Sequence, residues 1–203
     1  MSDYIEIMII AEGHTEKRFI DEILTPYMAA KNIFIRGQLV GKPGHKGGDI
    51  RFSRVEKDIA IHLKQRKDTF VSMFVDYYGI KKDWPGLNEA RQCTSPKTIA
   101  DAMNRATKKE VLSKFADHGA DDRFIPFIAV HEFEALLFSD INILASQLKV
   151  DLSTFEKILE ECGEPENINN SPNSAPSIRL KRIFNPYKKK TNGLTIANLT
   201  FCR

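Results

Sequence analysis

The sequence predicts an α/β fold in which a mainly parallel sheet carries helices on both faces. Four apolar segments of strand length each precede a stretch whose apolar residues recur at helical spacing. The chain has 203 residues, a length that fits one domain, and 42% of them are hydrophobic, enough to fill a sizeable core. The longest apolar runs are strand-sized, far shorter than the roughly 20 residues that span a bilayer.

The first strand is expected at residues 5–11, a run of Ile and Met that is typical of a strand buried on both faces. A tight turn at Gly13 follows, and His14 or Thr15 is expected to cap the next helix. The apolar residues of this helix recur at helical spacing, at Phe19, Ile20, Ile23, Leu24 and Tyr27.

The second strand is expected at residues 32–40 and the third at residues 69–75. Between them, residues 41–48 have the sequence GKPGHKGG, which predicts a flexible loop. A helix is expected after this loop, because one apolar stripe is formed by Phe52, Val55, Ile59, Ala60 and Leu63.

A helix is also expected to begin at Ser95 and Pro96, since Ser is a common cap and Pro is favoured at the first helical position. Its expected core face consists of Ile99, Ala102, Met103, Ala106, Leu112 and Phe115. Residues 124–130 predict the fourth strand, and His131 is expected to open the helix after it.

Two further helices are expected near residues 152–162 and 178–184, separated by a loop rich in Asn and Pro. The alternation of strands and helices ends before them. Residues 1–150 are therefore expected to form the α/β domain, and residues 151–203 a basic, helical appendage that packs on the same domain.

Positive charge is concentrated in two parts of the chain, although the formal net charge is only +3. Residues 42–67 hold more Lys and Arg than Asp and Glu. Residues 167–203 contain no Asp or Glu, and their basic residues are Arg179, Lys181, Arg182, Lys188, Lys189, Lys190 and Arg203. Clustered positive charge is typical of proteins that bind polyanions such as nucleic acids. The alternative is a solvated surface with a solubility tail.

Several protein classes are excluded by what the sequence lacks. The three cysteines show no C-x-x-C spacing, which argues against a disulfide framework and against a zinc ribbon. The amino terminus has no basic segment followed by an apolar stretch, so we expect a cytoplasmic protein without a membrane partner. The loop at residues 41–48 lacks the Walker pattern, so nucleotide hydrolysis by that route has little support.

Acidic residues follow three of the four predicted strands. In an open parallel sheet, ligands bind at the carboxyl ends of the strands. The residues expected at this edge are Glu12, Glu16, Asp76, His131, Glu132 and Glu134. Carboxylates gathered at one edge repel one another unless they share a cation, and hard oxygen ligands favour Mg²⁺ or Mn²⁺. The sequence therefore predicts a divalent-metal site at this edge of the sheet.

Each of these residues also has a purely structural interpretation. Glu12 and Glu16 can complement the positive end of the first helix dipole. Asp76 can simply cap a turn. His131 can be a core histidine or a helix cap instead of a ligand.

Glu132 and Glu134 cannot play equivalent roles on an α-helix, because at about 100° per residue they lie roughly 200° apart. One is expected to face the site and the other solvent or a basic partner, and the sequence does not distinguish them. Tyr77 and Tyr78, which follow Asp76, can stack on a base or a sugar, or they can fill the core.

Four ordered blocks resemble the bacterial RloG-like family, a group related to the TOPRIM domain. The blocks are EGHTE at residues 12–16, FVDYYG at 74–79, HEFEALLF at 131–138 and SAPSIRL at 174–180. The resemblance implies a TOPRIM-like, Rossmann-like sheet, in which a glutamate after the first strand and a D-x-D pair after the third bind Mg²⁺ for phosphodiester chemistry. Glu12 matches that glutamate and Asp76 the first aspartate, whereas Tyr78 stands where the second aspartate is expected.

The leading hypothesis is therefore a Mg²⁺- or Mn²⁺-dependent nuclease of a bacterial defence system or mobile element. The metal ligands that the resemblance implies are Glu12, Asp76 and either Glu132 or Glu134. His131 or Glu16 is the expected general acid or base. The expected phosphate-binding residues are Lys42, Lys46, Ser177, Arg179, Arg182, Lys188, Lys189 and Lys190.

The alternative hypothesis is a non-catalytic adaptor or regulatory subunit that docks an ATPase or nucleic acid. Tyr78 in place of an acid favours it. Members of the RloG-like family are similar to components of mobile defence islands that often lie beside an ATPase gene, so the resemblance implies an ATPase partner protein. The other expected partners are DNA or RNA and a second copy of this chain.

Overall fold

The computed structural model describes residues 4–41, 50–168 and 173–201. Contacts divide the chain into two compact units, which we call unit 1 (Met1–Val130) and unit 2 (His131–Arg203). The division falls directly after the last strand, and so it comes earlier in the chain than the boundary expected at residue 150. The expected packing of the appendage, residues 151–203, on the α/β domain stays a prediction.

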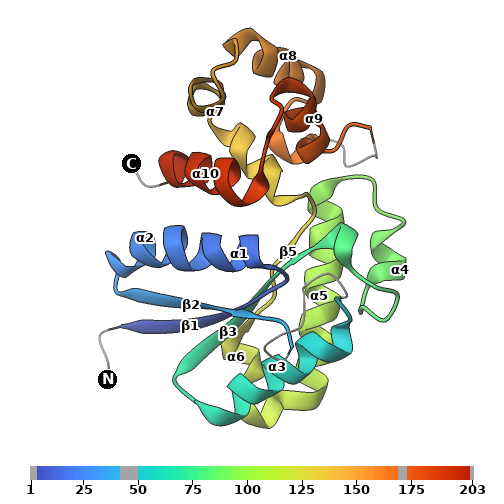
Figure 1. The fold of residues 1–203 in the computed structure, drawn as a ribbon. Helices are drawn as coiled ribbons and strands as arrows, with labels where there is room; N and C mark the ends of the chain where they lie inside the picture. The colour runs from blue at the N-terminus through green and yellow to red at the C-terminus, as the bar shows by residue number, and fades with distance from the viewer. Residues whose placement is uncertain (1–3, 42–49, 169–172, 202–203) are drawn as a thin grey trace. The chain divides into compact units, whose positions relative to one another are not determined.

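Unit 1 contains a parallel sheet, which confirms the predicted fold class (Figure 1). Its strands are β1 (Ile5–Ala11), β2 (Ile33–Leu39), β3 (Thr69–Asp76), β4 (Phe124–Ile125) and β5 (Ile128–Ala129). The order is β2-β1-β3-β4, and β5 also pairs with β3. Because all pairs are parallel, the carboxyl ends of the strands meet at one edge.

Helices cover both faces of this sheet, with α1 and α2 on one face and α3 and α5 on the other (Figure 1). The longer helices are α3 (Phe52–Gln65) and α5 (Pro96–Phe115), and the short ones are α4 (Leu87–Ala90) and α6 (Ala120–Arg123). The predicted start of α5 is confirmed, because Ser95 and Thr98 form a capping box in front of it. The core between α3, α5 and the sheet includes Val55, Ile59, Val71, Met73 and Met103.

The first helical segment differs in detail from the prediction. It consists of α1 (His14–Phe19), a π-helical turn η1 (Ile20–Leu24) and α2 (Thr25–Ala29). Its N-cap is Gly13 in an extended conformation, so the prediction that His14 or Thr15 caps the helix is wrong. The helix begins at His14, which places Thr15 inside the first turn, where its side chain is buried.

The prediction of one continuous strand over residues 124–130 is also wrong. The structure has two short strands there, β4 and β5, and Pro126 lies between them. Proline has no backbone N–H and cannot donate to a sheet ladder, which accounts for the interruption. The neighbouring side chains of Ile125 and Phe127 are largely exposed.

The outer edge of β2 is protected by side chains from the first helical segment. The backbone N–H of Gly37 donates to Asp21 Oδ1 at 2.9 Å. The hydroxyl of Thr25 donates to the Ile35 carbonyl at 2.8 Å. A Cβ at position 37 would lie 3.0 Å from Asp21 Oδ1, so glycine allows this close approach. These contacts occupy edge groups that another chain could otherwise pair with.

We expect Asp21→Ala to lower the free energy of unfolding by about 1–2 kcal/mol, because the Gly37 N–H loses its acceptor. Glu22→Ala is the matched control, since Glu22 makes an exposed ion pair with Arg18, and the loss of this pair should cost under about 0.5 kcal/mol. Urea denaturation of both variants measures the difference. Equal losses would show that the contact with β2 contributes nothing.

Unit 2 contains helices joined by turns and no strand among the residues that the structure describes. Its α-helices are α7 (Ile141–Leu148), α8 (Leu152–Cys162), α9 (Pro176–Ile183) and α10 (Leu194–Phe201), and its other turns are η4 (Phe133–Ser139), η5 (Pro165–Asn167) and the π-helical η6 (Lys189–Gly193). Phe138 and Phe155 meet edge to face in its interior, with ring centroids 6.0 Å apart. In both units, no helix within the described ranges is long and apolar enough to cross a membrane.

The helix expected to open at His131 is not an α-helix. A 3-10 helix, η4, occupies Phe133–Ser139, and α7 begins only after Asp140. Asp140 Oδ1 accepts a hydrogen bond from the Ile143 N–H at 3.0 Å and so caps α7. The 200° separation expected for Glu132 and Glu134 therefore does not apply, because neither residue lies on an α-helix.

Candidate functional site

Glu12 lies directly after β1, at the carboxyl edge of the sheet. Its backbone N–H donates to the Phe74 carbonyl at 3.1 Å, which extends the pairing of β1 with β3 by one residue. Its Oε2 atom accepts a hydrogen bond from the Asp76 N–H at 2.9 Å. The Glu12 carboxylate thus crosses from the end of β1 to the end of β3. The structure brings together two of the residues that the sequence placed at this edge.

Gly79 forms the other side of the Glu12 carboxylate. A Cβ at position 79 would lie 2.6 Å from Glu12 Oε1, well inside van der Waals contact. Gly79 ends the 3-10 turn η2 (Tyr77–Gly79), which follows β3. One carboxylate oxygen is therefore fixed by a backbone N–H and the other lies against a residue that has no side chain.

Asp76 combines a structural role with its place at the site. Its Oδ1 atom accepts a hydrogen bond from the Tyr78 N–H at 2.8 Å and caps η2. This is the turn-capping interpretation considered from the sequence. The capping bond also holds the Asp76 carboxylate in one orientation at the end of β3, next to the backbone N–H that binds Glu12.

Glu16 lies one helical turn after Glu12, in the first turn of α1. Its carboxylate turns back toward the chain, since a Cβ at Gly13 would lie 2.7 Å from Glu16 Oε2. Gly13 and Gly79 thus each accommodate one glutamate. The two glycines distinguish Glu16 from Glu12 experimentally, because an added methyl group at either position displaces a different carboxylate.

The two tyrosines after Asp76 have different environments. Tyr77 packs against the core of unit 1, whereas Tyr78 is 55% exposed. Their rings meet edge to face with centroids 5.4 Å apart. Tyr77 therefore fits the core-filling interpretation, and Tyr78 presents an aromatic surface where the resemblance led us to expect a second aspartate.

The donor set at this edge suits a hard divalent cation. Mg²⁺ typically keeps several water ligands and is bound through one or two carboxylates. The carboxylates at the strand ends here are those of Glu12 and Asp76. Within residues 4–41, 50–168 and 173–201, no three His, Cys, Asp or Glu side chains are gathered as a metal-binding group. Any protein site here would consist of two carboxylates completed by water or substrate oxygens.

The three acidic or imidazole residues expected from the fourth strand belong to unit 2. Glu132 Oε2 accepts a hydrogen bond from the Ser177 N–H at 3.0 Å, in the first turn of α9. Glu134 is buried, and its Oε2 lies 3.5 Å from Lys189 Nζ. Burial lowers the pKa of His131, although a hydrogen bond with the Glu166 backbone opposes this shift.

The expected phosphate-binding residues of unit 2 are partly engaged within the fold. Arg179 Nε donates to the Ser174 carbonyl at 3.0 Å, and Arg182 Nη1 to the Asn173 carbonyl at 2.8 Å. Lys189 pairs with Glu134, and Ser177 uses its backbone N–H to bind Glu132. Lys188 and Lys190 are exposed. Lys42 and Lys46 lie outside the described residues.

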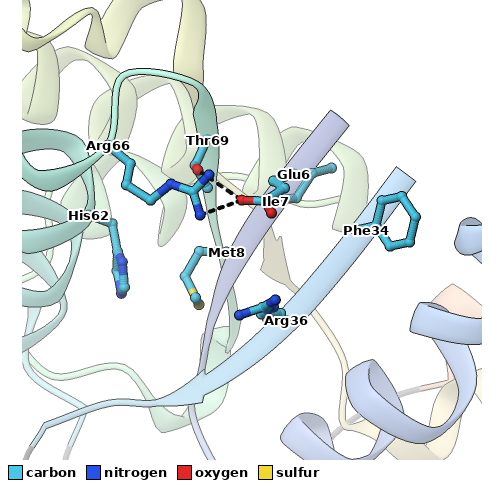
Figure 2. A pocket seen from close by; sticks show the side chains of 8 residues that line it. All are labelled: Glu6, Ile7, Met8, Phe34, Arg36, His62, Arg66 and Thr69. Carbon is cyan, nitrogen blue, oxygen red and sulfur yellow. Dashed lines mark hydrogen bonds and ion pairs between the residues drawn. The ribbon is translucent and has the colours of Figure 1, made fainter. Parts of the chain in front are cut away.

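A small pocket of about 50 Å³ lies near the amino end of β1 (Figure 2). Arg66 Nη1 and Glu6 Oε2 form an ion pair of 2.7 Å at one side of it. His62 Nε2 lies 2.8 Å from Gln38 Oε1, and burial lowers the pKa of this histidine. The pocket is also lined by Ile7, Met8, Phe34, Arg36 and Thr69. Glu12 is not among its lining residues, and no pattern in the sequence indicated this pocket.

Two other residues were not predicted as site residues from the sequence. Gly79 was identified only as part of a motif, although a glycine in a turn at a strand end is a signal for close backbone approach. Tyr187 gave no signal, because only the structure places its phenol close to the carboxylates of Glu132 and Glu134.

Comparison with known proteins assigns a family and no activity. Neither the curated proteins nor the solved structures gave a match. One family matches residues 11–200, a range that includes Glu12, Asp76 and the whole of η4. The chain therefore belongs to the family described as a domain of unknown function, DUF4276.

Proposed function

We propose that this protein is a Mg²⁺- or Mn²⁺-dependent nuclease that hydrolyses phosphodiester bonds. The observation that carries the proposal is the placement of the Glu12 carboxylate on the Asp76 N–H, at the carboxyl edge of a parallel sheet. Ligands of open parallel sheets bind at this edge. The resemblance to TOPRIM-like and RloG-like proteins supports the same proposal, since Glu12 and Asp76 match its motif residues.

Glu12 and Asp76 would hold the metal. Bound there, the ion would activate water and stabilise the leaving oxygen. Asp76 N–H and Gly79 keep the Glu12 carboxylate in place, and Tyr78 N–H does the same for Asp76, so both ligands are pre-organised. Glu16, whose carboxylate turns back over Gly13, is the proposed general acid or base in unit 1.

The exposed lysines of unit 2 supply the proposed contacts with nucleic-acid phosphates. Lys188 and Lys190 lie at the surface, and Arg182, which precedes them in the chain, is also exposed. Binding through such residues weakens as salt concentration rises. The RloG-like resemblance extends the proposal to a cytoplasmic, bacterial defence system with an ATPase partner.

The second candidate is an adaptor that binds an ATPase or nucleic acid without cleaving it. Tyr78 favours this candidate, because an exposed aromatic ring stands where a second metal ligand is expected. Metal binding discriminates between the two. An adaptor does not need Glu12 and Asp76 to bind a cation.

The test is calorimetric titration of Mn²⁺ and Mg²⁺ together with cleavage of mixed DNA and RNA substrates. Glu12→Gln and Asp76→Asn should each weaken metal binding and reduce cleavage by more than the roughly 10- to 100-fold that changes around metal ligands cost. Asp117→Asn, an exposed acid of unit 1, is the matched control and should leave both unchanged.

Two outcomes would contradict the nuclease proposal. If the wild-type protein with Mn²⁺ leaves every DNA and RNA form intact, it is not an autonomous nuclease. If it binds no metal at millimolar concentration, the adaptor becomes the better assignment.

A further inference from the structure

Glu134 is a buried carboxylate with an incompletely satisfied oxygen. The residue is 2% exposed, and its Oε2 accepts no hydrogen bond from the described residues. The nearest cation, Lys189 Nζ, lies 3.5 Å away, whereas a well-formed bond between ammonium and carboxylate is about 2.7–2.9 Å long. A buried charge is costly unless it is paired and hydrogen-bonded. When it is ionised, the Glu134 carboxylate therefore lacks a closely paired cation among the described residues.

The hydroxyl of Tyr187 is another buried oxygen of unit 2 without a hydrogen-bond partner among the described residues. Tyr187 is 6% exposed. A Cβ at Gly193 would lie 2.9 Å from this hydroxyl, so the phenol is enclosed on that side. Burial raises the pKa of Tyr187, and the negative charges of Glu134 and Glu132 raise it further. The same Cβ at Gly193 would lie 3.4 Å from Phe133 Cε1, so the phenol lies near the segment that contains both glutamates.

These four residues define a cluster within unit 2, which we call the Glu134 cluster: Glu132, Glu134, Tyr187 and Lys189. The Ser177 N–H donates a hydrogen bond to Glu132 Oε2, which fixes the position of the Glu132 carboxylate. With both glutamates ionised and Lys189 protonated, the cluster has one more negative than positive charge. A water molecule can donate to the free oxygens, but it leaves this imbalance in place.

The oxygen donors of the cluster are those that a hard cation selects. The oxygens available are those of the Glu132 and Glu134 carboxylates and the Tyr187 phenol, and Lys189 contributes a positive charge 3.5 Å from Glu134 Oε2. The Lys189 side chain is 36% exposed, and its ammonium lies 5.7 Å from the centre of the Phe133 ring, which also attracts cations. The Lys189 ammonium can therefore move from the Glu134 carboxylate toward solvent and stay near the Phe133 ring.

We propose that the Glu134 cluster is a cation site specific for a hard divalent ion, formed entirely by residues of unit 2. Glu134, Glu132 and Tyr187 supply its oxygen ligands. Lys189 acts as a tethered cation that balances Glu134 while the site holds no metal and moves to the surface when the metal enters. The proposal does not depend on the nuclease assignment, because every residue involved belongs to unit 2.

The experiment uses the full chain with Glu12→Gln and Asp76→Asn, which removes the proposed site of unit 1. Calorimetric titration with Mn²⁺ should still detect one ion in this background. Adding Glu134→Gln or Tyr187→Phe should weaken that binding by about tenfold or more. Glu160→Gln, at an exposed acid of α8, is the matched control and should bind Mn²⁺ as the background does.

Lys189→Met gives a readout that a structural ion pair would not give. The substitution leaves Glu134 without its cation, so the metal-free protein should unfold at a lower temperature. Mn²⁺ should restore the lost stability and bind more tightly than in the chain that retains Lys189. Lys181→Met, at an exposed lysine of α9, should show neither effect.

The proposal is overturned by either of two results. One is unchanged Mn²⁺ binding in both Glu134→Gln and Tyr187→Phe. The other is a destabilised Lys189→Met variant that Mn²⁺ does not rescue, which would make Glu134 and Lys189 a structural pair only. Failure of the nuclease proposal gives a different pattern: the wild type cleaves no DNA or RNA, or its metal binding does not respond to Glu12→Gln and Asp76→Asn, while the response to Glu134→Gln and Tyr187→Phe persists.

Discussion

Replacing Arg123 by Met is expected to lower the free energy of unfolding of unit 1 by about 3 kcal/mol or more. Arg123 ends α6 and is only 8% exposed. Its guanidinium donates hydrogen bonds to the backbone carbonyls of Leu63, Arg66, Thr69 and His118. These carbonyls come from the end of α3, the loop after it, the start of β3 and the turn before α6. One side chain therefore joins four segments, and its loss removes a hydrogen-bond donor from two buried and two part-buried carbonyls.

Trp84 provides the measurement, because it is the only tryptophan and is buried in unit 1. Its fluorescence during urea denaturation follows this unit. Arg123→Lys should recover little of the loss, since one ammonium cannot reach four carbonyls that a planar guanidinium serves. Arg91→Met, at an exposed arginine, should change stability by less than about 0.5 kcal/mol. Equal effects at positions 91 and 123 would show that the carbonyl contacts carry no net stability.

Arg123 illustrates what the sequence could not predict. It follows two aspartates in a polar stretch and looks like a surface residue. Its role depends on carbonyls far away in the chain, which no local pattern records. By contrast, the helices and most strands were predictable because apolar periodicity depends only on neighbouring residues. The bounds of β1 and α8 agree with the residues predicted for them.

The incorrect fold predictions have local physical causes. Residues 124–130 are apolar enough for one strand, but Pro126 removes a ladder donor, and this signal is present in the sequence. The α-helix expected at His131 is replaced by a 3-10 helix, and the cap that starts α7 is Asp140. An Asp before an apolar stretch was the better start signal there.

The candidate site was predictable where it depends on strand ends. Glu12 and Asp76 follow two strands that pair in parallel, so their proximity follows from topology. The placement of Glu132 and Glu134 was not predictable in the same way. The chain enters unit 2 directly after β5, and what those glutamates contact depends on α9 and on Tyr187, both distant in sequence.

Gly79→Ala should abolish most of the proposed metal-dependent cleavage while leaving the fold intact. The new methyl group would lie 2.6 Å from Glu12 Oε1, so the carboxylate must move away from the Asp76 N–H that holds it. The Asp76 N–H then loses its acceptor, so we expect the free energy of unfolding to fall by about 1–2 kcal/mol. A ligand displaced by about 1 Å, however, can reduce a rate by about 100-fold. Cleavage assays and Mn²⁺ titration measure both consequences.

Gly13→Ala is the matched control, because its methyl group would lie 2.7 Å from Glu16 Oε2 and displaces that carboxylate instead. If Glu16 is the general acid or base, this variant should lose cleavage and keep its affinity for Mn²⁺. Gly79→Ala should lose both, since Glu12 is a proposed ligand. If Gly79→Ala binds Mn²⁺ and cleaves like the wild type, Glu12 is not a metal ligand of the site. The two glycines therefore separate metal binding from proton transfer without changing either acidic residue.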